Sequence, residues 1–145
     1  MTRVIAGCTL TFFLAACQPG GEVAVPGDSK DHAGYAGIAA DETIRFTGTE
    51  PFWGGTAQGE RLVYNTPETP DGTTITVKRF AGRGGLALSG NLGDSRFDLT
   101  ITEGECSDGM SDRSYPFTAT LVVGGENRQG CAWTDAKRFK GPANP

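Results

Sequence analysis

The feature that most constrains the fold is the alternation of apolar and polar residues along short segments that glycine-rich turns separate. The clearest case is 96–102, where Phe97, Leu99 and Ile101 share one face of an expected strand. The same pattern recurs in the segments 43–47, 61–64, 73–78, 85–91, 117–123 and 130–133. Turn-forming sequences lie between them at 70–72, 82–85, 91–94 and 124–125. The sequence therefore predicts an all-β fold, a small antiparallel barrel or sandwich.

The start of the chain has the pattern of an export signal. One positive charge, Arg3, precedes an apolar run over 4–16, which is too short to span a bilayer but has the length of a signal-peptide core. The run ends in Leu14-Ala-Ala-Cys17, which resembles the lipobox of bacterial lipoproteins. That resemblance implies that 1–16 is a lipoprotein signal peptide and that Cys17 carries lipid, including an acyl chain such as palmitate. The alternative is an ordinary export signal that leaves a free cysteine.

These features predict how the chain is divided. Segment 17–40 holds the lipidated cysteine and a linker rich in Gly, Ala and Pro, for which we expect a flexible tether. A single β-rich domain is expected over 41–140, with a tail at 141–145. The expected location is the bacterial cell envelope, facing the periplasm. Because Gln18 follows the cysteine in place of aspartate, analogy with enterobacterial lipoproteins favours the outer membrane.

The cysteines predict one disulfide. Cys8 leaves with the signal peptide and Cys17 is used for lipid, so Cys106 and Cys131 remain for the folded domain. An oxidising compartment permits a bond between them. A pair of buried thiols is the alternative. A two-cysteine metal site is less favoured, because no CxxC spacing occurs and the one histidine, His32, lies in the linker.

Composition and motifs argue against several functions. The net charge of −4 and the absence of a basic cluster argue against nucleic-acid binding. No P-loop, GxGxxG or HExxH motif occurs. With its one histidine in the linker, the domain lacks the base of a serine or cysteine triad. We expect neither a cofactor nor a metal, and no enzyme.

The stretch 48–54, GTEPFWG, is the first candidate site. Glu50, Phe52 and Trp53 could form an exposed recognition patch, because large aromatic side chains dominate binding hot spots. The alternative, which we favour, places the aromatic pair in the core at the end of a barrel, with the indole N–H bonded to a backbone carbonyl.

The stretch 106–117, CSDGMSDRSYPF, is the second candidate. Its carboxylates, Asp108 and Asp112, together with Glu103 and Glu105 just before it, suggest a calcium or glycosidase site, but the spacing fits neither. We favour a structural corner in which Asp108-Gly109 forms a turn and Asp112 or Ser111 caps a short helical turn. Arg113 would then pair with Asp108 or Asp112, and Tyr115 would begin the next strand.

Together these motifs resemble a known group. GTEPFWG, LVYNTPETPDG and CSDGMSDRSYPFTATLVV…GCAW are similar to the TEPFW and C-SDGMSDR-YP…GCA motifs of a family of small, uncharacterised bacterial envelope lipoproteins, some linked to META-type domains. The resemblance covers 48–133. It implies the anchor, the cysteine pair and the β-rich domain, and it supplies no activity.

The expected function is therefore a lipid-anchored envelope protein that acts as a non-catalytic binding or structural module. Its partner would be an envelope protein or peptidoglycan. One alternative is an inhibitor of a cell-wall hydrolase such as lysozyme, which rests on fold analogy alone. The other is a hydrolase that acts through carboxylates.

Overall fold

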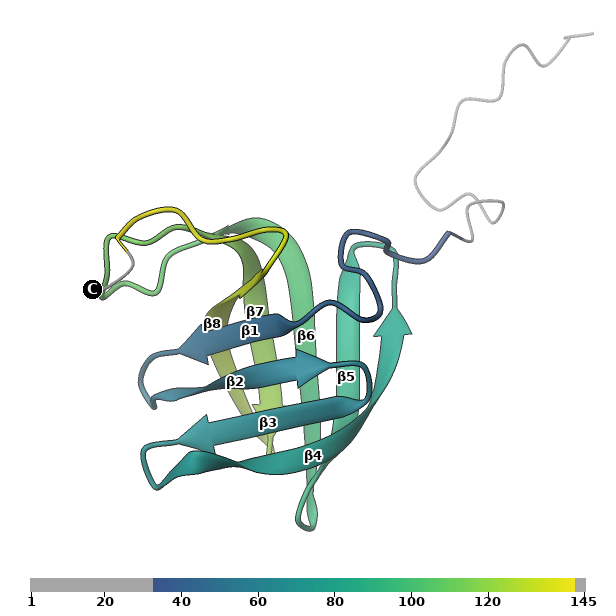
Figure 1. Ribbon diagram of the computed structural model, residues 1–145. Coiled ribbons are helices and arrows are strands. Elements are labelled where there is room, and N and C mark those ends of the chain that lie inside the picture. Colours follow the sequence, from purple (N-terminus) through teal and green to yellow (C-terminus); the bar gives the residue numbers. More distant parts are fainter. Residues whose placement is uncertain (1–32, 143–145) are drawn as a thin grey trace, which may run out of the picture. The chain divides into compact units, whose positions relative to one another are not determined.

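The computed structural model describes residues 33–142, and these form one β-barrel (Figure 1). Its strands are β1 (Ile44–Gly48), β2 (Trp53–Gln58), β3 (Arg61–Thr66), β4 (Thr69–Ala81), β5 (Gly85–Leu92), β6 (Ser95–Cys106), β7 (Tyr115–Val123) and β8 (Glu126–Thr134). All pairs are antiparallel and follow the chain order. The predicted all-β class is confirmed, as a closed barrel and not a sandwich. Within 33–142 no helix is long and apolar enough to cross a membrane.

Closure comes from the pairing of the first strand with the last. β1 hydrogen-bonds to β2 on one side and to β8 on the other, with Ile44 opposite Thr134 and Gly48 opposite Gly130. A closed sheet leaves no edge strand with unpaired backbone groups. Every strand of the barrel is thus paired on both sides.

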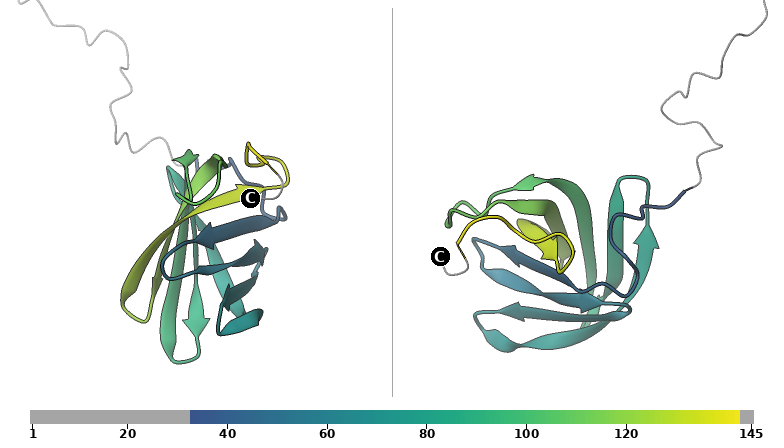
Figure 2. Two further views of the ribbon diagram at one scale, coloured as in Figure 1. Left: turned by 90° about the vertical axis from the view of Figure 1, so that its left-hand side faces the viewer. Right: turned by 45° about the horizontal axis from the view of Figure 1, so that its top comes forward.

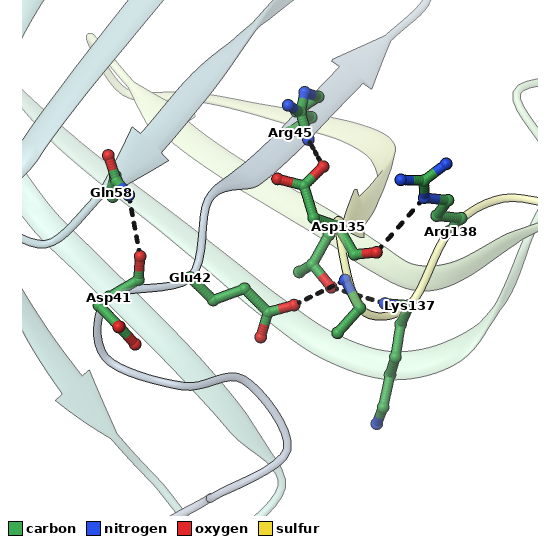
Figure 3. A network of polar contacts seen from close by, with 9 residues as sticks. Asp41, Glu42, Arg45, Gln58, Asp135, Lys137 and Arg138 are labelled. Atoms are coloured by element: carbon green, nitrogen blue, oxygen red, sulfur yellow. Dashed lines mark hydrogen bonds and ion pairs between the residues drawn. The ribbon is translucent and has the colours of Figure 1, made fainter.

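Side chains at the start of β1, just before it and after β8 reinforce this seam (Figure 3). Arg45 forms an ion pair with Asp135 at 2.7 Å. The carboxylate of Glu42 accepts hydrogen bonds from the backbone N–H groups of Ala39 and Ala136. The pKa of the Glu42 carboxyl is lowered, mainly by a side-chain hydrogen bond with Thr134 and further by these two backbone hydrogen bonds. The segment leading into β1 is therefore tied to the segment that leaves β8.

The interior of the barrel is filled by the residues that the sequence alternation predicts to point inward. Phe97, Leu99 and Ile101 are fully buried, as predicted. The same holds for the inward residues of other strands: Ile44, Phe46, Leu62, Ile75, Val77, Leu86, Leu88, Phe117, Ala119 and Leu121. A small barrel with these side chains is packed solid. Ligands must therefore be sought on its surface.

Two local predictions were wrong. β2, with the sequence WGGTAQ, was not predicted as a strand, because Gly54 and Gly55 interrupt the apolar alternation. The turn between β3 and β4 lies at 67–68 and not at 70–72. Gly72 instead lies within β4 with φ of 78°, near a register irregularity between Tyr64 and Thr66 of β3. A glycine with positive φ inside a strand is typical of such irregularities.

The folded unit begins earlier than predicted. Ile38 is 2% exposed and belongs to the core, although 17–40 was expected to be tether. Arg79 donates to the backbone oxygens of Ile38 and Ala39, and the Tyr35 hydroxyl donates to Glu103. At least 33–40 therefore belongs to the domain. The predicted signal peptide, Cys17 and His32 lie outside the described residues.

One end of the interior is closed by an indole over two glycines. The Trp53 ring is 3% exposed and packs beside Phe46, with ring centroids 5.8 Å apart. A Cβ on Gly48 would lie 2.0 Å from Trp53 Nε1, and one on Gly130 would lie 2.9 Å from Trp53 Cζ2. The ring therefore occupies the space that side chains at these two paired positions would need.

We expect Gly48→Ala to lower the free energy of unfolding by about 1 to 3 kcal/mol, because the added methyl group overpacks the indole. Gly84→Ala is the matched control, since nothing lies within 4 Å of a Cβ at that turn position. It should leave stability within about 0.5 kcal/mol of the wild type. Urea denaturation of both variants measures the difference, and equal midpoints would contradict the assigned packing.

Candidate functional site

The structure brings the two motif stretches together on one side of the barrel. The Thr49 hydroxyl, in the loop between β1 and β2, donates to the backbone oxygen of Asp108 at 3.4 Å. The loop between β6 and β7 reaches this position because β6 departs from regular pairing between Glu103 and Cys106. Figure 1 shows that loop crossing above the barrel toward the β1–β2 turn.

The disulfide between Cys106 and Cys131 holds this arrangement, as predicted. The two Cα atoms are 5.6 Å apart, and Cys131 is fully buried. Cys131 lies on β8 directly opposite Thr47 of β1. The bond therefore fixes the start of the β6–β7 loop beside the β1–β2 loop, and both alternatives, free thiols and a two-cysteine metal site, are wrong.

We expect reduction of this bond to lower the free energy of unfolding by about 2 to 5 kcal/mol, the usual range for small exported domains. The double variant Cys106→Ser/Cys131→Ser should show the same loss. Adding reductant to the double variant is the control, because it has no bond to break. A wild type whose thermal melting does not respond to reductant would contradict a stabilising role.

Asp108 organises the β6–β7 loop. Its Oδ1 accepts hydrogen bonds from the backbone N–H groups of Met110 and Ser111, and its Oδ2 accepts from the hydroxyls of Ser111 and Tyr115. The prediction that Asp112 or Ser111 caps a short helical turn was wrong, because Asp108 itself accepts these bonds and no helical turn forms. An Asp that bonds to N–H groups two and three residues later makes an Asx turn.

These bonds determine the charge state of Asp108. Burial alone would raise the pKa of its carboxyl, but the hydrogen bonds from Ser111, Met110 and Tyr115 outweigh burial and lower the pKa to about 2. The carboxylate is therefore ionised and its acceptor positions are used within the loop. That is the chemistry of a structural acceptor, not of a general acid.

The depressed pKa predicts a pH dependence of stability. The unfolded chain has the ordinary value of 3.8, so the stabilisation from Asp108 is present above about pH 4 and is lost as the pH falls toward 2. We expect the stability difference between wild type and Asp108→Asn to narrow over that interval. Asp112→Asn is the control, because the Asp112 carboxylate accepts no hydrogen bond from residues 33–142. A difference that stays constant from pH 6 to pH 2 would contradict the assignment.

Arg113 is held differently from the prediction. Its Nε donates to the backbone oxygen of Pro142 at 2.9 Å, and its Cζ lies 4.6 Å from the centre of the Phe139 ring. Within residues 33–142 it forms no ion pair with Asp108 or Asp112. The expected carboxylate pairing was therefore wrong, and a cation–π contact with the returning C-terminal segment is present instead.

Tyr115 begins β7, as predicted, and centres a small aromatic cluster. Its ring lies 5.4 Å from Trp133 and 5.6 Å from Phe139, measured between centroids. Ser114 and Lys140 exchange two backbone hydrogen bonds beside it. Segment 137–142 is thus part of the fold, and the predicted tail at 141–145 begins no earlier than residue 143.

The aromatic pair of the first motif is divided between core and surface. Trp53 is buried, as expected, whereas Phe52 is 50% exposed. The prediction that both rings belong to the core was wrong for Phe52. The predicted hydrogen bond from the indole N–H to a backbone carbonyl was also wrong, because Trp53 Nε1 is buried and has no acceptor among residues 33–142. Glu50 is exposed and has a φ of 51°, which is uncommon for a residue other than glycine.

Two surface grooves flank the β1–β2 loop. The motif groove, of about 460 Å³, lies between this loop and the start of the β6–β7 loop. It is lined by 47–51, 106–108, 118 and 127–130. The glycine groove, of about 410 Å³, lies on the other side of the loop, next to Phe52. It is lined by Phe46, Thr47, Gly48, Phe52, Trp53, Gly54, Gly55, Asn65, Thr66, Pro67, Pro70 and Trp133.

The glycine groove was missed in the sequence, and its chemistry is distinct. None of its lining residues carries a charge. The Asn65 amide lies over Gly54, with its Oδ1 3.3 Å from the place of a Cβ there, and has no hydrogen-bond partner among residues 33–142. The WGG sequence was the available signal, because a glycine on an outer strand face leaves a gap in the surface.

Within residues 33–142, no three His, Cys, Asp or Glu side chains are grouped closely enough to hold a metal ion. Asp108 and Asp112 are close in sequence, but they do not form a ligand set.

Comparison of the chain with models of protein families, with curated proteins and with solved structures finds no match. Function must therefore be argued from the geometry of the surface.

Proposed function

We propose that this protein is a lipid-anchored envelope protein that acts as a non-catalytic binding module, with the β1–β2 loop as its recognition element. The observation that carries the proposal is the exposure of Phe52 in the glycine groove, on a loop whose residues 49–51 line the motif groove, beside a buried Trp53 that fixes the loop. An exposed aromatic side chain on a well-anchored loop is typical of a binding hot spot.

The packing of the barrel supports a surface site. Its interior is filled by apolar side chains, so a ligand would bind to the outside. The disulfide and the Asp108 turn hold the wall of the motif groove in one conformation. A wall ordered before binding lowers the entropic cost of binding.

The carboxylate hydrolase is less favoured. Asp108, the most buried acid of the second motif, accepts four hydrogen bonds within its own loop. Its lowered pKa keeps it ionised, so it does not supply a proton near neutral pH. Inhibition of a cell-wall hydrolase remains a form of the binding proposal, and lysozyme is one ligand that the experiment below includes.

The position of the β1–β2 loop is compatible with a protein that a lipid anchors to a membrane. The β1–β2 and β3–β4 turns lie at the opposite end of the barrel from the β4–β5 turn and from the first described residues (Figure 1). With the lipid proposed on Cys17, the tether would enter at the end that carries the β4–β5 turn. The β1–β2 loop would then face away from the membrane.

We expect Phe52→Ser to reduce binding of an envelope ligand at least tenfold, the effect of removing a hot-spot side chain, without a change in melting temperature. The full chain carrying Cys17→Ser, which cannot be lipidated, is titrated against peptidoglycan fragments, lysozyme and isolated envelope proteins by calorimetry. Phe80→Ser is the matched control, because Phe80 is exposed at the other end of the barrel.

Two outcomes would contradict the proposal. A ligand whose affinity is equal in wild type and Phe52→Ser would show that the loop is not the recognition element. An unmodified Cys17 in the mature protein, found by mass spectrometry, would refute the lipid anchor.

A further inference from the structure

The most exposed large apolar side chain among residues 33–142 is Phe80, at 70%. It is the penultimate residue of β4, and its partner on β5 is Ala87. Lys78 lies two residues earlier, on the same outer face, and Arg83 lies in the turn that follows; both are exposed. We call Lys78, Phe80 and Arg83 the tether-end patch.

The described chain begins beside this patch. Tyr35 donates its backbone N–H to the oxygen of Gly82 at 2.7 Å. Gly34 lies against Ala81, whose backbone oxygen is 3.2 Å from the place of a Cβ on Gly34. Figure 2 shows the same arrangement, with the segment before β1 running next to the β4–β5 hairpin. The chain that precedes Ala33 therefore joins the barrel at the patch.

The chain length limits how far this end can be from a lipid anchor. Cys17 precedes Ala33 by sixteen residues. A chain of that length spans at most about 55 Å when fully extended. If Cys17 is lipidated, as the proposed function holds, the tether-end patch is confined near the bilayer, and a weak contact gains from the high local concentration.

We propose that the tether-end patch contacts the membrane surface, with the Phe80 ring at the boundary between headgroups and acyl chains and with Lys78 and Arg83 on anionic lipid phosphates. Aromatic side chains favour this boundary, and basic side chains are attracted to anionic headgroups. This inference rests on the proposed lipid anchor and assigns a second membrane contact to the folded domain.

The charges around the patch suit a lipid surface. On the outer face, Phe80 is level with Ala87 of β5 and, one strand further, with Thr100 of β6, and both are uncharged. The nearest acid in this register, Asp98, pairs with Arg96. Lys78 is level with Ser89 of β5 and, one strand further, with Asp98 of β6, and the backbone of Glu60 bonds to Val77 next to it. Neither Lys78 nor Arg83 forms an ion pair within residues 33–142, so both cations can interact with an anionic surface.

A protein partner fits the patch less well. A stable protein interface buries about 800 Å² on each side and has an apolar centre of several residues. The patch offers one aromatic ring between two cationic side chains. It therefore has the composition of an interfacial membrane contact.

The test is photo-crosslinking of the full chain in the membranes of a bacterium that processes it. The photoreactive residue p-benzoylphenylalanine replaces Phe80 in one variant and Phe52 in the matched control, because both side chains are exposed and lie at opposite ends of the barrel. After illumination, mass spectrometry identifies the adducts. We expect lipid adducts at position 80 and none at position 52.

The role of the two cationic side chains in lipid contact is tested with the lipidated protein in vesicles that contain phosphatidylglycerol. Lys78→Gln/Arg83→Gln should lower the adduct yield at position 80, as should high salt. In vesicles of phosphatidylcholine alone, the double variant should match the wild type. An equal yield for the two proteins in anionic vesicles would overturn the role of the cations.

The outcomes of these experiments distinguish a failure of the proposed lipid anchor from a failure of the proposed membrane contact. A lipidated Cys17 without lipid adducts at position 80, or with adducts to protein there, would overturn the inference and leave the proposed function standing. Equal lipid adducts at positions 80 and 52 would also overturn it. An unmodified Cys17 together with lipid adducts at position 80 would refute the anchor and support the patch.

Discussion

The pairing of β1 with β8 is the interaction on which the rest of this structure depends. It closes the sheet and encloses the core. It also sets Gly130 beside Gly48, which creates the space that the Trp53 indole fills. The same pairing places Cys131 opposite Thr47, so the disulfide brings the β6–β7 loop to the β1–β2 loop. The motif groove is therefore a product of barrel closure and of one covalent bond.

Much of the fold could be predicted because the alternation is local. A strand that faces a core on one side and water on the other must alternate, and β6 and β7 do so over most of their length. The disulfide followed from counting cysteines. β2 could not be found this way, because its inward position at Gly55 has no side chain, and the space there is taken by the Phe46 ring.

The candidate site was harder to predict because it depends on contacts between distant segments. Asp108, Ser111 and Asp112 are all good capping residues, and only the backbone of the loop decides which one is used. Arg113 is held by Phe139 and Pro142, which return to it from beyond β8. Phe52 and Trp53 are adjacent, and side chains of adjacent residues at the start of a strand point to opposite sides, so one of the two could have been expected outside.

The strand order also has a consequence for folding. Seven of the eight strand pairs join neighbours in the chain and can form as hairpins. The eighth joins segments as distant as Arg45 and Asp135, which are 90 residues apart. Closing a loop of that length costs about 2 kcal/mol more chain entropy than closing one of ten residues. Of the eight strand pairs, the last one therefore carries the largest loop-closure cost.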